Sequence, residues 1–149
     1  MRLEPLYRLT FTYPAGWQVE LEGGWQQHFY LAEGRCEGGV IGRFHGANFP
    51  LRRTQEGPFR PDLRGVIETD DAATIMFELH GYGRAHPAGR RQVVGSVFHT
   101  SDHPDYRRLN DVVCVCAGEV RSAADAGASS PELVLDVAEL IWEPIAPER

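Results

Sequence analysis

The chain has 149 residues, of which 42% are hydrophobic and 24% are charged, and its formal net charge is −6. These values are typical of one soluble globular domain, and the acidic balance argues against a nucleic-acid partner, because phosphate binding needs concentrated Lys and Arg. The sequence holds no run of about 20 apolar residues and no signal-peptide segment, so we expect no membrane partner and a cytoplasmic location.

The first half of the chain reads as several short strands. Apolar and polar residues alternate over residues 3–13, which predicts a half-buried strand. Pro14 and Gly16 then predict a turn, followed by a short strand at 17–21. Two more strands are expected at residues 26–32 and 39–45.

Residues 59–82 form the most informative stretch, because two predicted strands are joined there by a tight acidic turn at 69–72. On the first strand Asp62, Arg64, Glu68 and Asp70 all fall on one face, since side chains alternate along a strand. This face fits two interpretations. It is either a solvated outer wall with cross-strand charge pairs, or a polar lining inside a barrel, where Arg64 holds an anion or carbonyl and a carboxylate moves protons.

The second half of the chain continues the pattern. Strands are predicted at residues 93–100 and 111–120, with one helical turn between them and a small-residue loop tip at 122–130. The last element, residues 131–142, fits a helix that starts after Ser130 or an alternating β-branched strand. We interpret it as a strand, because a closed barrel leaves no exposed edge.

The sequence therefore predicts an all-β fold: a single antiparallel β-barrel of about eight to ten strands with a central cavity and little helix, spanning residues 1–149. The three cysteines are an odd number in a chain without an export signal, which favours free thiols. Cys114 and Cys116 share one strand face but lack the second ligand pair of a structural zinc site, so we expect small buried hydrophobic residues there.

Sequence motifs do not identify a reaction. Phosphate-binding loops, dinucleotide fingerprints, hydrolase elbows and the metalloprotease helix motif are all missing from the sequence. His45, His80 and His99 each lie near the end of a predicted strand, so a metal site at a barrel mouth is a weaker alternative. No cofactor is expected.

Three segments carry a resemblance to a known family. Asp62, Arg64 and Glu68 are followed by the T-D-D run at 69–71, and two shorter matches flank this segment. In this pattern the chain resembles the bacterial family called domain of unknown function 3237, over roughly residues 7–137. The flanking matches are Gly42, Gly46 and Phe49 on one side and Tyr106, Leu109 and Asn110 on the other. The chain departs from the family at Asn48, where an acid is usual, and at Phe49 and Arg108, where Trp is usual.

The resemblance implies a fold similar to the allene oxide cyclase and dirigent barrels, built around a small-molecule cavity, and it implies a homodimer. We therefore expect a barrel that binds a small organic ligand, with cofactor-free cyclase or isomerase chemistry as the preferred hypothesis. Arg64 would polarise a carbonyl, and Asp62 or His45 would act as general acid or base. The expected ligand-binding residues are Tyr30, Phe44, Phe49, Tyr82 and Asn110. The alternative is a binding or interaction module with the same pocket and no proton chemistry.

Overall fold

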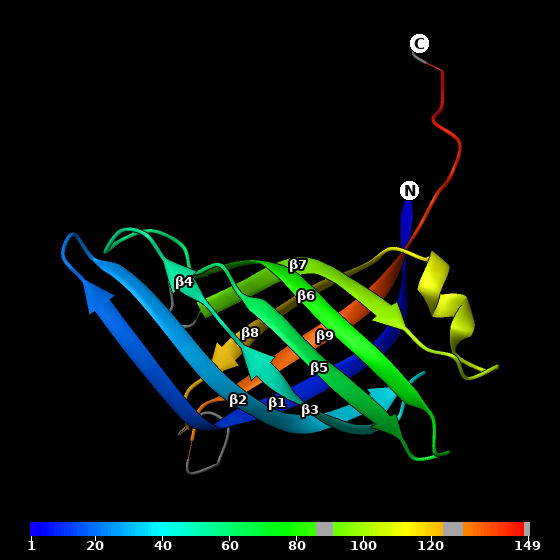
Figure 1. The fold of residues 1–149 in the computed structure, drawn as a ribbon. Coiled ribbons are helices and arrows are strands. Elements are labelled where there is room, and N and C mark those ends of the chain that lie inside the picture. Colours follow the sequence, from blue (N-terminus) through cyan, green and yellow to red (C-terminus); the bar gives the residue numbers. More distant parts are fainter. Residues whose placement is uncertain (86–90, 124–129, 148–149) are drawn as a thin grey trace.

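The computed structural model describes residues 1–85, 91–123 and 130–147. In these ranges nine strands and one 3-10 helix follow one another along the chain (Figure 1). They are β1 (Arg2–Leu21), β2 (Trp25–Gly38), β3 (Gly42–Asn48), β4 (Leu51–Arg52), β5 (Asp62–Thr69), β6 (Thr74–Ala85), β7 (Arg91–Thr100), η1 (Arg107–Asp111), β8 (Cys114–Arg121) and β9 (Glu132–Ile141).

Eight of these strands close into a ring, so the predicted all-β antiparallel barrel is confirmed. The hydrogen-bonded order is β1-β9-β8-β7-β6-β5-β3-β2, and β2 pairs with β1 to complete the circuit. Every pairing is antiparallel, and the short β4 adds to β2 at Gln26 and Gln27. Among the described residues no helix is long and apolar enough to cross a membrane.

The predicted turn at residues 14–16 is wrong, because β1 runs through it as one strand of 20 residues. The pairing register with β2 shifts between Thr12 and Ala15, which marks a β-bulge. Pro14 fits a bulge because a bulged residue need not donate to the ladder. The extra residue also reverses which side chains point inward: Phe11 faces the core before the bulge, and Gly16 faces inward after it.

Beyond the bulge, β1 and β2 continue as a hairpin, residues 15–31, that projects past most of the ring at the left of Figure 1. Its outer face is apolar and exposed, with Trp17 60% accessible. The other exposed side chains of this face are Val19, Leu21, Trp25, Phe29 and Leu31. Farther along β2 the outward positions are charged, as at Glu33 and Arg35, so the apolar outer face ends there along this strand. Next to the hairpin it continues to Phe49, whose ring centroid lies 4.9 Å from that of Phe29.

The two ends of the barrel differ. At one end η1 inserts the buried Leu109, and Asn110 holds η1 to the end of β7 by exchanging hydrogen bonds of 2.7 and 2.9 Å with the Ser101 backbone. We call this the closed end, and the helical turn predicted there is confirmed. The opposite end, which includes the hairpin, is called the open end.

The last element is a strand, β9, as predicted. It pairs with both β8 and β1, and its Leu135 and Val137 enter the core. The loop tip predicted at residues 122–130 lies mostly outside the described residues. Cys36, Cys114 and Cys116 are free and buried, as expected. Burial raises the pKa of Cys36 and Cys116 to about 12 and that of Cys114 to about 11, which keeps all three as thiols.

Candidate functional site

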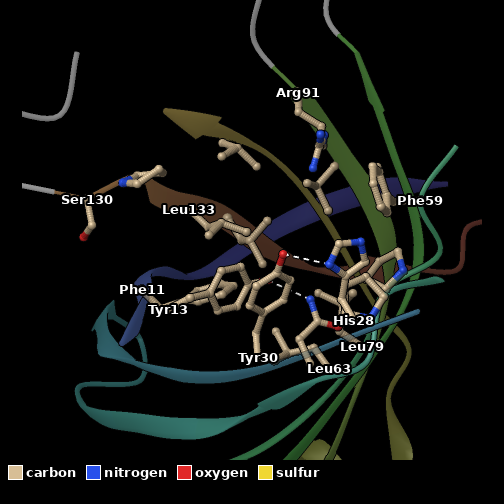
Figure 2. Close-up of a pocket in the computed structure, with 18 residues that line it drawn as sticks. Phe11, Tyr13, His28, Tyr30, Phe59, Leu63, Leu79, Arg91, Ser130 and Leu133 are labelled. Atoms are coloured by element: carbon tan, nitrogen blue, oxygen red, sulfur yellow. Dashed lines mark hydrogen bonds between the residues drawn. The ribbon is translucent and has the colours of Figure 1, made fainter. Parts of the chain in front are cut away.

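A cavity of about 420 Å³ lies inside the open end of the barrel (Figure 2). Residues from strands all around the ring and from the connection before β5 contribute to its wall. Its apolar lining includes Phe11, Phe59, Leu63, Leu79, Val93, Val120, Leu133 and Leu135. The polar side chains on it are few: Tyr13, His28, Tyr30, Asn48, Arg91 and Ser130. An apolar cavity with a small number of polar groups is the usual form of a small-molecule site.

Two tyrosine rings form the floor of the polar part. Tyr13 and Tyr30 stack with ring centroids 4.4 Å apart and an interplanar angle of 16°. The hairpin backbone makes room for this stack at Gly16, where a Cβ atom would lie 2.3 Å from the Tyr30 ring. Sterics alone therefore favour glycine at this position, since its φ is not in the left-handed region.

Asn48 anchors one end of the stack. Its amide nitrogen donates a 2.7 Å hydrogen bond to Tyr13 Oη, and its amide oxygen accepts one of 3.1 Å from the Asp62 backbone. Because Tyr13 accepts from Asn48, the Tyr13 hydroxyl keeps its own proton available for a bound molecule. Burial raises the pKa of Tyr13 to about 12, so it remains a neutral phenol.

His28 and Tyr30 form a second polar pair, drawn as a dashed contact in Figure 2. Tyr30 Oη lies 2.9 Å from His28 Nδ1, and His28 Nε2 lies 3.3 Å from Gln26 Oε1. The Gln26 oxygen can only accept, so Nε2 carries the imidazole proton and Nδ1 accepts from Tyr30. Burial, and after it the charges of Arg52 and Arg91, lower the pKa of His28 below its ordinary value. The result is a neutral imidazole bound to a phenol at the cavity wall.

Arg91 enters the cavity from the mouth, above Phe59 in Figure 2. Its guanidinium carbon lies 4.4 Å from the centre of the Phe59 ring. Within the described part of the chain it is the only charged side chain on the cavity wall. The site can therefore offer a bound molecule aromatic surfaces, neutral proton donors and one cation.

Comparison with known proteins gives a family. The sequence matches the family described as "protein of unknown function (DUF3237)" over residues 1–140. The chain belongs to this family. No curated protein matches it. The family resemblance read from the T-D-D segment is therefore confirmed.

Solved structures with the same fold come from several organisms. A β-barrel-like protein from Acinetobacter baumannii AYE has 21% sequence identity and a TM-score of 0.76, with 93% of this chain and 94% of that chain covered. A protein of unknown function from Clostridium acetobutylicum has 15% identity and a TM-score of 0.77, with 93% and 97% covered. A structure described as an enzyme from Penicillium herquei has 18% identity and a TM-score of 0.69, with 93% and 92% covered. At these identities the likeness establishes the fold alone.

The segments by which the chain resembles the DUF3237 family lie mostly away from the cavity. Thr69 Oγ1 accepts a 2.8 Å hydrogen bond from the Ala73 backbone, and Ala72 adopts a φ of 68° in the turn between β5 and β6. Tyr106 Oη donates to both carboxylate oxygens of Asp71 at 3.0 Å. The T-D-D segment and the segment around Tyr106 thus bind each other at the closed end. Their role here is to hold that end together.

The prediction that Asp62 and Arg64 line the cavity is wrong. The Arg64 side chain is 63% exposed and lies 3.2 Å from Asp62 on the outer wall. Leu63, only 1% accessible, is the residue of this strand that faces the cavity. Because side chains alternate, the charged neighbours of Leu63 must point to solvent. Arg64 also faces Glu78 on β6, which is the cross-strand pairing of the solvated-wall interpretation.

The three histidines considered for a metal site do not converge. His45 lies on the outer wall 3.3 Å from Glu68, and His80 lies there 2.6 Å from Glu78. His99 is buried near the closed end and bonds to Tyr7 at 2.7 Å. A site built from these three residues is therefore excluded by their positions, and no group of three or more His, Cys, Asp or Glu in the described ranges is arranged to hold a metal.

Of the expected ligand-binding residues, only Tyr30 lies on the cavity wall. Phe44 is fully buried in the core, whereas Phe49 and Tyr82 are partly exposed outside it. Asn110 is at the closed end. Sequence reasoning missed Tyr13, His28, Asn48, Phe59 and Arg91. One signal was available for His28: it precedes Tyr30 by two residues, so the two share a strand face.

Proposed function

We propose that this protein binds a small, mostly apolar organic molecule inside the open end of its barrel. The observation that carries the proposal is the cavity of about 420 Å³ with apolar walls and convergent polar groups. A ring-containing body would contact Phe59, Tyr13 and the aliphatic wall. A carbonyl or hydroxyl oxygen of the ligand would accept from the Tyr13 hydroxyl, whose proton is not used by Asn48.

The Tyr30–His28 pair supports proton chemistry on the bound molecule, in a cyclase or isomerase reaction that needs no cofactor. The Tyr30 hydroxyl donates to His28 Nδ1, so the neutral imidazole 2.9 Å away accepts the Tyr30 proton and the phenolate takes a proton from one ligand position. Tyr30 then gives a proton to a second ligand position, and the imidazolium returns its proton to Tyr30. The pair can thus move a proton between two sites of one molecule. The Penicillium herquei structure of the same fold is described as an enzyme, which is compatible with catalysis.

Binding is tested with N-phenyl-1-naphthylamine, a neutral probe whose fluorescence rises in apolar sites. We expect one probe per chain to bind the unmodified protein. Val93→Trp should abolish binding, because Val93 lines the cavity and the larger ring fills it. The matched control is Val94→Trp on the adjacent, outward-facing and half-exposed position, which should leave binding unchanged. Equal binding by both variants would refute the cavity as the site.

Catalysis is tested on the natural ligand, recovered by denaturing the purified protein after native mass spectrometry. The recovered ligand is returned to fresh protein in deuterated water, and its mass is followed. Proton transfer by the pair should add deuterium to carbon, and Tyr30→Phe should slow this incorporation by about 100-fold, the lower range of general acid–base contributions. Deuterium incorporation that is unaffected by Tyr30→Phe, or absent altogether, would leave the non-catalytic binding module as the function.

A further inference from the structure

Six of the thirteen arginines in the described ranges have a carboxylate partner. Arg8 binds Asp136 at 2.6 Å, and Arg35 binds Asp70 at 2.7 Å. Four others are paired in the same way: Arg2, Arg64, Arg108 and Arg121. With 21 acidic and 15 basic residues in the sequence, carboxylates are available in excess.

Arg43, Arg53 and Arg107 form no ion pair in the described ranges, and neither do four arginines that lie over two aromatic rings: that of Phe59, which lines the cavity, and that of Tyr82. Arg52 and Arg91 lie over the Phe59 ring, at 4.9 and 4.4 Å from its centre. Arg60 and Arg84 lie over the Tyr82 ring, at 5.8 and 5.7 Å. We call these four residues the arginine rim. In the part of the chain that the structure describes, none of them forms an ion pair, although Glu56 borders the hollow next to Arg52 and Arg91.

One of the rim arginines, Arg52, is partly removed from water, whereas Arg91 is exposed at the mouth. Arg52 Nε is buried and has no hydrogen-bond acceptor among the described residues. Arg91 reaches the cavity, whose described lining contains no carboxylate. A buried donor without an acceptor is unfavourable, and more so when the group is charged. The aromatic faces of Phe59 and Tyr82 attract these cations but supply no negative charge.

We propose that the ligand of the cavity is an organic anion, with an apolar ring-containing body inside the barrel and an acidic group held at the mouth by Arg91 and Arg52. The inference rests on the small-molecule function proposed above and adds the chemical class of the ligand. A planar guanidinium with parallel N–H donors matches the two oxygens of a carboxylate or sulfonate, so the acidic group meets the donors that the protein leaves unpaired.

The electrostatics inside the cavity agree with this assignment. The charges of Arg52 and Arg91 reach His28, because they contribute to its lowered pKa after burial, and the opposite effect of Glu20 comes after theirs. The positive field of the two arginines stabilises an anion in the same space. Asn48 contributes an amide rather than a carboxylate to the wall, so no negative charge opposes the ligand there.

Two probes with nearly the same body separate the contribution of charge from that of apolar contact. 8-Anilino-1-naphthalenesulfonate carries a sulfonate on the framework of neutral N-phenyl-1-naphthylamine. We expect the unmodified protein to bind the sulfonate at least 10-fold more tightly than the neutral probe. Arg91→Gln should weaken sulfonate binding by about 10-fold or more, the range of a hydrogen bond to a charged group, and should leave the neutral probe within twofold.

Matched variants separate the charge of the cavity mouth from the overall charge of the protein and from adsorption elsewhere on its surface. Arg64→Gln makes the same chemical change to an exposed arginine of the outer wall and should alter neither affinity. Asn48→Asp adds a negative charge to the cavity and should weaken the sulfonate more than the neutral probe. Trp17→Gln tests whether probe adsorbs on the apolar outer face of the hairpin. If this variant binds as many probe molecules per chain as the unmodified protein, the probe does not bind on that face.

The outcomes are distinguishable. If both probes bind the cavity with equal affinity, and Arg91→Gln behaves like Arg64→Gln, the anionic class is refuted while the small-molecule function stands. If neither probe binds in a manner sensitive to Val93→Trp, the small-molecule function fails and the inference fails with it. The proposal is supported if only the Arg91 and Asn48 variants lose more affinity for the sulfonate probe than for the neutral probe.

Discussion

His99 makes the stability of this barrel depend on pH in a way that can be calculated. The side chain is 3% exposed and packs among Tyr7 and Phe77 inside the closed end. Tyr7 Oη lies 2.7 Å from Nε2, whereas Nδ1 is buried without a partner among the described residues. Protonation would place a charge and a second N–H donor in this apolar site. Burial accordingly lowers the pKa of His99 from 6.5 to about 4.

The direction of the effect follows from which state binds the proton more readily. The unfolded chain takes up the His99 proton near pH 6.5 and the folded protein only near pH 4, so stability from this group is fully present above pH 6.5 and is lost as the pH falls toward 4. Each unit of pKa shift corresponds to 1.36 kcal/mol, so the loss reaches about 3 kcal/mol below pH 4. Between pH 7 and pH 5 it amounts to about 2 kcal/mol.

The assay is urea unfolding at several pH values for the unmodified protein and His99→Gln, which cannot titrate but can still accept a hydrogen bond from Tyr7. Other groups titrate equally in both proteins, so the difference between their unfolding free energies isolates His99. As the pH is lowered from 7 to 5, the unfolding free energy of the unmodified protein should fall by about 2 kcal/mol relative to that of His99→Gln. His45→Gln, at a half-buried histidine of the outer wall, is the control. A difference that does not change with pH would refute the reasoning.

Three other changes test separate parts of the structure. Thr69→Val removes the hydroxyl that accepts from the Ala73 backbone and should lower the unfolding free energy by about 1–3 kcal/mol in urea. Gly16→Ala places a methyl group against the Tyr30 ring, so it should cost about 1–3 kcal/mol and weaken binding of the neutral probe; unchanged affinity would contradict the role given to the stack. The homodimer expected from the family resemblance would use the uncharged apolar outer face of the hairpin. Trp17→Glu should therefore convert the dimer to a monomer, measured by sedimentation velocity, without loss of thermal stability.

Local patterns in the sequence were sufficient for most of the barrel. Alternation identified the strands around Phe11, Ile75 and Val97, because each has one apolar face that the fold must bury. The last element was ambiguous by pattern and was assigned by the need to close the ring, which β9 does by pairing with β1. The predicted turn at Pro14 failed because proline and glycine mark turns and bulges alike, and only the partner strand distinguishes the two.

The candidate site was predicted less well than the fold. Alternation separates two faces of a strand but does not say which is inside, and the conspicuous charges of Asp62 and Arg64 drew attention to the outer one. Leu63 and Ile67 on the opposite face carried the better signal, because apolar side chains define the interior. The cavity combines residues from segments as distant as His28 and Arg91. No spacing along the chain connects them before the barrel closes.

Pairing of the first strand with the last also has a consequence for folding during synthesis. β1 is hydrogen-bonded to β9 from Arg2, opposite Ile141, to Phe11, opposite Leu133. A nascent chain therefore exposes one edge of β1 until nearly the whole domain has left the ribosome. Such long-range pairing forms slowly and leaves apolar strands open to other chains in the meantime. The yield of folded protein in the cell should thus depend on how fast residues 132–141 are translated after the rest of the chain, even for variants whose folded barrels are equally stable.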